Sequence, residues 1–270
     1  MGQRLFLFFA LYVCVTLPLQ AEQFTFSVVP QQSASKLAKQ WSPILTALSQ
    51  QTGHTFLFAT AKDIPTFESR LKQGRYDFAY MNPYHFVEFN RQPGYQAIAK
   101  AKDKQIKGII VVSKESGINS LEQLNGSQLA FPSPAAFAAS ILTRAHLSEN
   151  DIDFSPSYVS SHDSVYLSVA KGFFPAGGGV MRTFNAMDPA VKEQLIPIWS
   201  TKGYTPHAIA AHPEISEELY LKVQRFFENL HRTEQGKSLL TPLKLKGFTA
   251  AQNSDWDDVR ALNIDLLSAE

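Results

Sequence analysis

The sequence predicts an α/β protein built from two lobes, and three observations support this prediction. Short apolar strands alternate with amphipathic helices from residue 24 onward. The run 109–113 is almost continuously apolar, as is typical of a central strand buried on both faces. Setting aside the first 21 of 270 residues leaves 249, which is enough for two lobes of ordinary size.

The helices and strands follow from hydrophobic period and capping residues. Ser35 is expected to cap a helix over 35–50 that ends at Gly53, and Ser216 to cap an amphipathic helix over 216–231. The strands are expected at 24–29, 54–59, 76–81, 109–113, 128–131, 172–180 and 196–200. The remaining helices are expected at 65–73, 121–124, 135–145, 163–171, 234–240 and 255–267.

The order of these elements predicts that one lobe is inserted in the other. We expect the first lobe to comprise 22–107 and 205–270, and the second to comprise 108–204. Each lobe should contain a mixed, mostly parallel sheet flanked by helices. In such folds a ligand binds in the crevice outside the carboxyl ends of the strands.

The first 21 residues have the pattern of a signal peptide. Arg4 is followed by an apolar run over 5–17 and by a small residue, Ala21, after which we expect cleavage. The alternative, a membrane anchor, would need about 20 apolar residues. The only cysteine, Cys14, lies in this segment, so an exported chain would have no disulfide and no thiol chemistry.

Charge and motifs exclude several classes of protein. Without Arg4, Lys and Arg fall from 25 to 24 and balance the 24 Asp and Glu, and no basic run indicates a nucleic-acid partner. The Gly236–Ser238 triplet is no P-loop, because His231 stands where its first glycine is required. The histidines lack zinc-ligand spacing, so no metal, no cofactor and no enzymatic activity are expected.

At four places the chain resembles the phosphate, phosphite and phosphonate-binding family of ABC-importer periplasmic proteins. The resemblance spans residues 22–270 in order and spacing, although no single motif is specific. Its segments are Val28–Pro30 with Trp41–Ile44, Gly74–Tyr80, Ser113–Gly126, and Gly236–Leu240 through Lys246–Phe248 to Asp255–Arg260. It implies a type II periplasmic-binding fold, PhnD-like, that closes like a hinge on a small anion. It also implies a monomer whose ligand-closed form docks on a membrane permease.

The resemblance places an oxyanion at the N-terminus of the helix that follows Phe131. Backbone N–H groups and the helix dipole favour an anion there. The family is rich in Ser and Thr at this point, whereas this sequence keeps Ser133 and has Pro134, Ala135 and Ala136. Backbone donors from Ala135 and Ala136 are therefore expected, and the alternative is an ordinary helix capped by Ser133.

The loop after the third strand is implied to carry the ligand contacts of the first lobe. Tyr80, Asn82 and Tyr84 offer hydroxyl and amide groups on a partly apolar surface. The alternative is an ordinary Asn82–Pro83 turn between buried tyrosines.

Further contacts are expected from three other segments. The resemblance implies a ligand-contacting histidine at His162, which alternatively only begins a helix. Arg182, with Thr183, follows three glycines that would let backbone approach a ligand, and its guanidinium suits a carboxylate or phosphate. Classical phosphonate binders have an acidic residue near this point that contacts an amine of the ligand. Arg182 in this place therefore indicates an anionic ligand without an amino group. The alternative is an ordinary surface arginine. Gln31, at the end of the first strand, is a weaker candidate.

Two other functions share these features. A sensory binding protein would use the same clamp and present its closed form to a sensor kinase. An exported enzyme on this fold would need a perturbed carboxylate or histidine pair in the cleft. Phosphate, phosphite, a phosphonate, a sulfonate or a small carboxylate would all suit Arg182 and a helix N-terminus.

Overall fold

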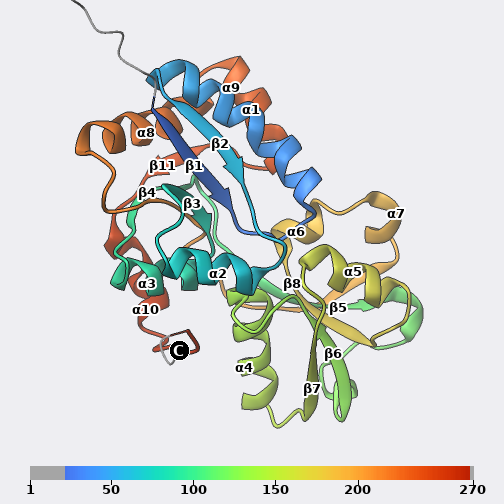
Figure 1. The fold of residues 1–270 in the computed structure, drawn as a ribbon. Helices are drawn as coiled ribbons and strands as arrows, with labels where there is room; N and C mark the ends of the chain where they lie inside the picture. Colours follow the sequence, from blue (N-terminus) through green and yellow to red (C-terminus); the bar gives the residue numbers. More distant parts are fainter. Residues whose placement is uncertain (1–21, 268–270) are drawn as a thin grey trace, which may run out of the picture.

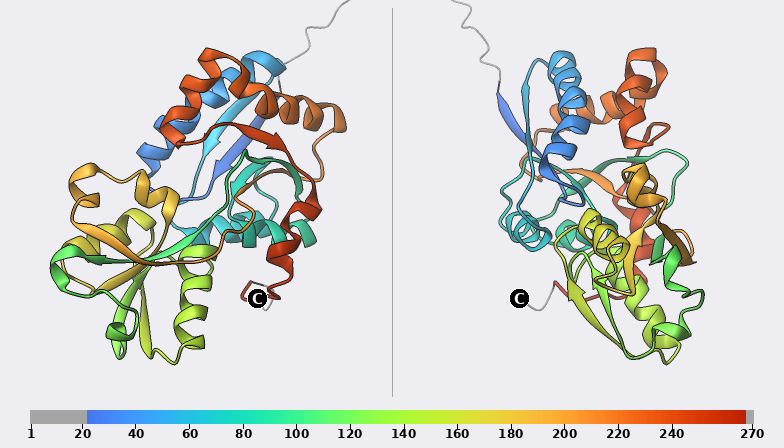
Figure 2. Two further views of the ribbon diagram at one scale, coloured as in Figure 1. Left: turned by 180° about the vertical axis from the view of Figure 1, so that it is seen from behind. Right: turned by 90° about the vertical axis from the view of Figure 1, so that its right-hand side faces the viewer.

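The structure, a computed structural model, describes residues 22–267. The predicted signal peptide at 1–21 lies outside these residues. The described chain forms a six-stranded and a five-stranded sheet, each flanked by helices, in two lobes (Figure 1). Figure 2 shows the same two lobes from behind and from the side.

The sheet of the first lobe has the strand order β11-β4-β10-β3-β1-β2. Strand β1 pairs in parallel with β2 and β3, whereas β10 pairs antiparallel with β3 and β4, and β11 antiparallel with β4. The bounds are β1 Gln23–Val28, β2 Thr55–Ala59, β3 Phe78–Met81, β4 Gln96–Ala101, β10 Ala208–Ala211 and β11 Phe248–Ala250.

The sheet of the second lobe has the order β7-β6-β8-β5-β9. Strand β6 is parallel to β7 and β8, and β5 is antiparallel to β8 and β9. The bounds are β5 Gly108–Ser113, β6 Ser127–Phe131, β7 Phe154–Tyr158, β8 Ala176–Val180 and β9 Leu195–Ser200. Both sheets are mixed, as expected, but neither is mostly parallel: within the described chain the first has two parallel and three antiparallel pairings, and the second has two of each.

The chain crosses between the sheets twice. The first crossing, 102–107, joins β4 to β5, and the second, 201–207, joins β9 to β10. A single bridge between Ile106 and Tyr204 pairs the two crossings. All strands of the second sheet thus fall within 108–200, inside the segment predicted to be inserted. The exact lobe boundaries stay a prediction.

The helices of the first lobe fall into two groups. Helices α8 and α9 lie at the end far from the second lobe, α1 runs from that end toward α6 (Met181–Asn185) of the second lobe, and α2 and α3 lie nearer to the second lobe (Figure 1). The bounds are α1 Ala34–Thr52, α2 Ile64–Lys72, α3 Pro83–Arg91, α8 Glu217–Asn229, α9 Glu234–Leu240 and α10 Asp257–Arg260. The C-terminal helix is therefore much shorter than the predicted 255–267, because the backbone leaves helical geometry after Arg260.

The N-terminal caps of two helices can be compared with those predicted from the sequence. Ser216 caps α8, as predicted, by accepting a hydrogen bond from the N–H of Leu219. The prediction that Ser35 caps α1 is wrong. Ser33 has the extended backbone that a cap requires, and its Oγ accepts from the N–H of Lys36, whereas Ser35 already lies in the first turn. Gly53 ends α1 in the left-handed conformation, at φ 79°.

The helices of the second lobe are α4 Leu142–Glu149, α5 His162–Ala170, α6 Met181–Asn185 and α7 Pro189–Lys192. Two of them, α5 and α6, begin with residues that contact the first lobe. The helix predicted over 135–145 begins instead as a π turn, Phe137–Ile141, which runs directly into α4. No side chain caps it, so the expected Ser133 cap does not form.

Glycines in the second sheet let this π turn lie against the strands. A Cβ on Gly178 would lie 2.0 Å from the carbonyl oxygen of Ala139, and one on Gly108 would lie 2.1 Å from that of Ala138. Gly179 is covered in the same way by the hydroxyl of Tyr166. The glycine run of β8 therefore serves packing inside its own lobe and is fully buried, contrary to the expectation that it approaches a ligand.

We predict that Gly178→Ala lowers the free energy of unfolding by about 3 kcal/mol, because backbone of the π turn must move to admit the methyl group. Urea denaturation measures this change. The control is Gly117→Ala, at φ 73° with open space around it, where only backbone strain of about 1 kcal/mol applies. Equal losses in the two variants would show that close packing does not explain the glycine at 178.

Candidate functional site

The candidate site lies where loops of the first lobe meet helix starts of the second. The loop after β1 brings the carbonyl oxygen of Gln31 within 3.0 Å of the N–H of His162, the first residue of α5. The loop after β3 brings Nδ2 of Asn82 within 3.3 Å of the carbonyl oxygen of Ala135. These loops follow the carboxyl ends of the two adjacent parallel strands, which is where this class of sheet places ligands.

A small cavity, which we call the interlobe cavity, lies between these elements. Its volume is about 10 Å³, roughly the space of one water molecule. Both lobes contribute to its wall. The polar side chains that line it are Gln31, Asn82, His162 and His207, and residues 136–139 line it from the π turn.

The π turn directs backbone donors toward the interlobe cavity. The carbonyl oxygen of Ala136 accepts from the N–H groups of Ser140 and Ile141. The N–H groups of Phe137, Ala138 and Ala139 precede these in the first turn, where no earlier carbonyl of the helix can accept from them. The helix dipole adds partial positive charge at the same place.

The first free backbone donors of this helix are thus those of Phe137 to Ala139, two to three residues after the predicted Ala135 and Ala136. Ala136 donates its N–H to the carbonyl oxygen of Ser133, and Ala135 presents its carbonyl oxygen to Asn82. Ser133 is buried, and its hydroxyl has no hydrogen-bond partner among the described residues. A buried hydroxyl without a partner is uncommon, so Ser133 keeps a free donor beside the turn.

A chain of hydrogen bonds links Arg182 to the first lobe. Nη2 of Arg182 donates to Oε1 of Gln31 over 2.7 Å, and Nε2 of Gln31 lies 2.8 Å from Nε2 of His207. Because the amide oxygen of Gln31 is taken by Arg182, its amide nitrogen donates to the imidazole. We therefore assign His207 as neutral, with its proton on Nδ1.

His162 is held from within the second lobe. Oγ1 of Thr183 lies 3.3 Å from Nδ1 of His162 and 2.9 Å from the hydroxyl of Tyr166, which in turn donates to the carbonyl oxygen of Val180. Thr183 therefore orients the imidazole instead of facing the interlobe cavity. Nε2 of His162 is left as the ring nitrogen that a ligand can reach.

Burial sets the protonation state of the site. Loss of solvent and, to a smaller extent, the charge of Arg182 together lower the pKa of His162 to about 3. The same two causes lower the pKa of His207 well below its usual value. Burial raises the pKa of Tyr80, which stacks on His207 at 5.0 Å between ring centroids. The imidazoles and the phenol are all neutral at pH 7.

Arg182 is the one positive charge in this cluster. Its guanidinium is half-buried, and no carboxylate within residues 22–267 forms an ion pair with it. The residue therefore supplies positive charge that the protein itself leaves uncompensated. Such a group, next to convergent neutral donors, favours an anion.

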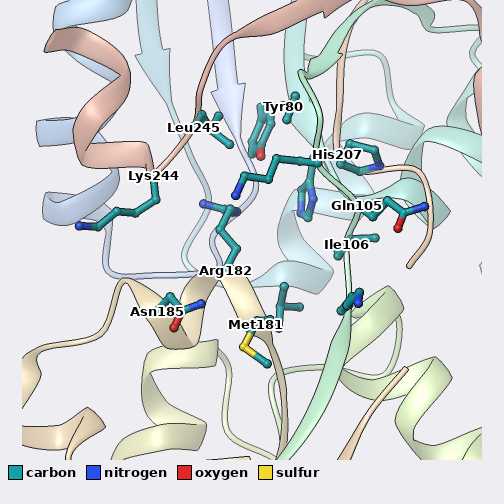
Figure 3. Close-up of a pocket in the computed structure, with 14 residues that line it drawn as sticks. Tyr80, Gln105, Ile106, Met181, Arg182, Asn185, His207, Lys244 and Leu245 are labelled. Atoms are coloured by element: carbon teal, nitrogen blue, oxygen red, sulfur yellow. The ribbon is translucent and has the colours of Figure 1, made fainter. Parts of the chain in front are cut away.

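A second and larger pocket, which we call the side pocket, opens on the other side of Arg182. Its volume is about 160 Å³, and it lies between the first crossing, α6 and the loop at Lys244. Figure 3 shows Arg182 reaching from α6 toward Tyr80, whose hydroxyl is turned toward the guanidinium. The side pocket shares Ile106, Val180 and His207 with the wall of the interlobe cavity.

The structure brings most of the predicted site residues together, with one exception. Gln31, Tyr80, Asn82, Ala136, His162 and Arg182 line the interlobe cavity or the side pocket, and Ala135, Ser133 and Thr183 lie directly behind them. Tyr84 lies elsewhere. In the first turn of α3, it faces away from the cleft, and its hydroxyl accepts from the N–H of Leu267 over 2.8 Å.

Sequence reasoning missed His207 and the contacts around Lys36. His207 immediately precedes the apolar strand β10, and this position in the sequence is a signal for a buried ring. Nζ of Lys36 donates to the carbonyl oxygen of Ala186 over 3.0 Å and lies 3.8 Å from Asp163, so α1 is tied to the second lobe. No sequence pattern relates these positions, because they meet only across the lobes.

This fold and cleft define a two-lobed solute-binding protein. The model of the family described as "ABC transporter, phosphonate, periplasmic substrate-binding protein" matches residues 26–256. The chain therefore belongs to the family of periplasmic phosphonate-binding components of ABC transporters, as the resemblance implied, and this is a family of substrate-binding proteins.

Individual relatives are distant but cover most of the chain. The Phosphate-import protein PhnD of Mycolicibacterium smegmatis is 23% identical, covering 88% of this chain and 84% of the relative. The phosphonates-binding periplasmic protein of Escherichia coli is 21% identical, covering 90% of this chain and 76% of its own length.

Solved structures confirm the fold. A binding protein component of an ABC phosphonate transporter from Pseudomonas aeruginosa has a TM-score of 0.83 at 19% identity, covering 90% of this chain and 86% of that one. PhnD1 of Prochlorococcus marinus, in complex with methylphosphonate, has a TM-score of 0.82 at 19% identity, covering 90% and 98%. The type II periplasmic-binding fold is thus correct.

We predict that acidification destabilises the fold partly through His162. Below about pH 6.5 the unfolded chain takes up a proton on this histidine that the folded chain refuses until about pH 3, so stability falls across that window. His162→Gln should remove up to about 1.4 kcal/mol per pH unit from the slope. Urea denaturation of both proteins between about pH 6 and pH 4 measures it. Parallel slopes would contradict the neutral, buried imidazole.

Proposed function

We propose that this chain is an exported binding component of an ABC importer that captures a small phosphorus oxyanion, phosphonate or phosphate, in its interlobe cleft. The observation that carries the proposal is Arg182, a guanidinium that has no carboxylate partner in the described part of the chain and is hydrogen-bonded across the lobes to Gln31. The names of the relatives, which refer to phosphate import and to phosphonates, support the same ligand class.

The oxyanion would be held by donors from both lobes. The N–H groups of Phe137 to Ala139 and Nε2 of His162 would serve from the second lobe, and Nδ2 of Asn82 from the first. Neutral donors suit this task because they stabilise the anion without adding charge that would have to be buried when it leaves. Arg182 would supply the countercharge.

Binding requires the lobes to separate first. A cavity of about 10 Å³ is too small for a tetrahedral oxyanion. The crossings at 102–107 and 201–207 are the only covalent links between the sheets and are the natural hinge, with their sole pairing at Ile106 and Tyr204. The oxyanion would enter the open cleft, replace the Gln31 amide as the partner of Arg182, and hold the lobes together.

The closed form would then dock on a membrane permease. Export would follow the signal peptide at 1–21, with cleavage after Ala21, and the mature protein would act as a monomer. No cofactor is needed, since the proposed site binds its ligand and performs no reaction.

Arg182→Ala tests the proposal directly. Charge-assisted hydrogen bonds contribute about 1.5–3 kcal/mol, so methylphosphonate or phosphate should bind roughly 10 to 100 times more weakly. Arg182→Lys should recover part of the loss, because it keeps the charge without the planar fork. Titration calorimetry on the chain from residue 22 measures these affinities.

Tyr84→Phe is the matched control. It removes a hydroxyl that the sequence assigned to the site and the structure places at Leu267, so affinity should stay within about twofold. Wild-type affinity in Arg182→Ala, or no binding of any phosphorus oxyanion by the wild type, would refute the proposed function.

A further inference from the structure

The side pocket has a chemical character that a simple oxyanion does not require. We propose that it receives a second anionic group of the same ligand, so that the natural ligand is a phosphonate or phosphate whose substituent ends in a negative charge. This inference rests on the proposed function and specifies its ligand class.

The side pocket is lined by basic side chains and by no acidic one. Lys104, Lys107, Arg182 and Lys244 contribute to its wall, together with the amides of Gln105 and Asn185. Asp103 directly precedes Lys104 in sequence, but it lines a neighbouring hollow and not this pocket. None of the four basic residues has an ion-pair partner within residues 22–267.

This concentration of charge is local. The whole chain is nearly balanced, with 25 Lys and Arg against 24 Asp and Glu, so a wall with only basic residues does not follow from composition. Uncompensated like charges around one hollow repel each other, and an anion placed among them relieves that repulsion. A ligand amine would meet the same charges unfavourably.

The side pocket adjoins the proposed oxyanion site. Ile106, Val180 and His207 form a wall common to the side pocket and the interlobe cavity, and Arg182 stands at their junction. A ligand with its phosphorus group in the cleft can therefore extend past Arg182 into the wider space of about 160 Å³. Apolar atoms of Leu245 and Met181 provide a surface for a short methylene chain.

The proposal depends mainly on the two lysines of the first crossing. Lys104 and Lys107 belong to the hinge segment, whereas Figure 3 shows the side chain of Lys244 directed away from Arg182. An anion held between the hinge lysines and α6 would touch both lobes. It would therefore favour the closed form as well as the ligand that carries it.

The experiment compares ligands that differ only in charge. The probes are phosphonoacetate and 3-phosphonopropionate, each against its carboxamide, with methylphosphonate as the reference and 2-aminoethylphosphonate as the cationic counterpart. We expect at least one acid to bind about tenfold more tightly than its amide at low salt, with a smaller difference at high salt because exposed charges are screened. The aminoethyl compound should bind more weakly than methylphosphonate.

The variant Lys104→Gln/Lys107→Gln tests the site. It should reduce the preference for acid over amide to about threefold or less. The ratio of the two affinities is the readout, because a general effect of the hinge substitutions on closure would change both affinities alike. Lys246→Gln removes an exposed charge two residues from Lys244 that does not line the pocket, so it should keep the full preference.

The outcomes separate the two proposals. If methylphosphonate binds through Arg182 but no acid is preferred to its amide, or the preference survives in the double variant, the side-pocket inference fails and the proposed function stands. If no phosphonate binds, both fail.

Discussion

The hydrogen bond from Arg182 to Gln31 is the contact on which the arrangement of the cleft depends. It joins α6 of the second lobe to the loop after β1 of the first, and through Gln31 it fixes the proton of His207. Burial keeps both imidazoles neutral, and the charge of the same guanidinium lowers their pKa values in the same direction. A ligand that competes for this one side chain therefore acts at once on the closure of the lobes and on the electrostatics of the cleft.

The second lobe is built to hold the start of one helix in place. Gly108 and Gly178 let the carbonyl oxygens of Ala138 and Ala139 lie directly over the sheet, so the N–H groups of the same turn project toward the first lobe. The hydroxyls of Tyr166 and Thr183 perform a similar task for His162. Preorganised donors of this kind do not need to be ordered when a ligand binds.

Sequence reasoning recovered what depends on local pattern and lost what depends on contacts between segments that are distant in the sequence. The buried strands, the Ser216 cap and the inserted order of elements follow from hydrophobic period and capping chemistry, and Arg182 and His162 follow from family spacing. The packing role of the glycines in β8 could not be predicted from the sequence. Glycine permits close approach of any partner, and the partner here is the π turn. Tyr84 was wrongly assigned to the site because it lies close to Tyr80 in the sequence. Helix α3 begins at Pro83, and its first turn directs the side chain of Tyr84 out of the cleft. His207 enters the site only through Gln31, a contact across 176 residues.

The central claim is that an oxyanion on Arg182 holds the two lobes closed, and the distance between the lobes tests it most directly. Cys14 is the only cysteine and lies before residue 22, so Lys39→Cys and Lys171→Cys, both exposed, provide one label on α1 and one just after α5 in a chain from residue 22. Electron–electron double resonance then gives the distribution of label distances. At a concentration just sufficient to saturate the wild type, methylphosphonate should shift this distribution toward the short distance, and it should do so much less in Arg182→Ala. An equal shift in both proteins, or none in the wild type at saturating ligand, would contradict the account.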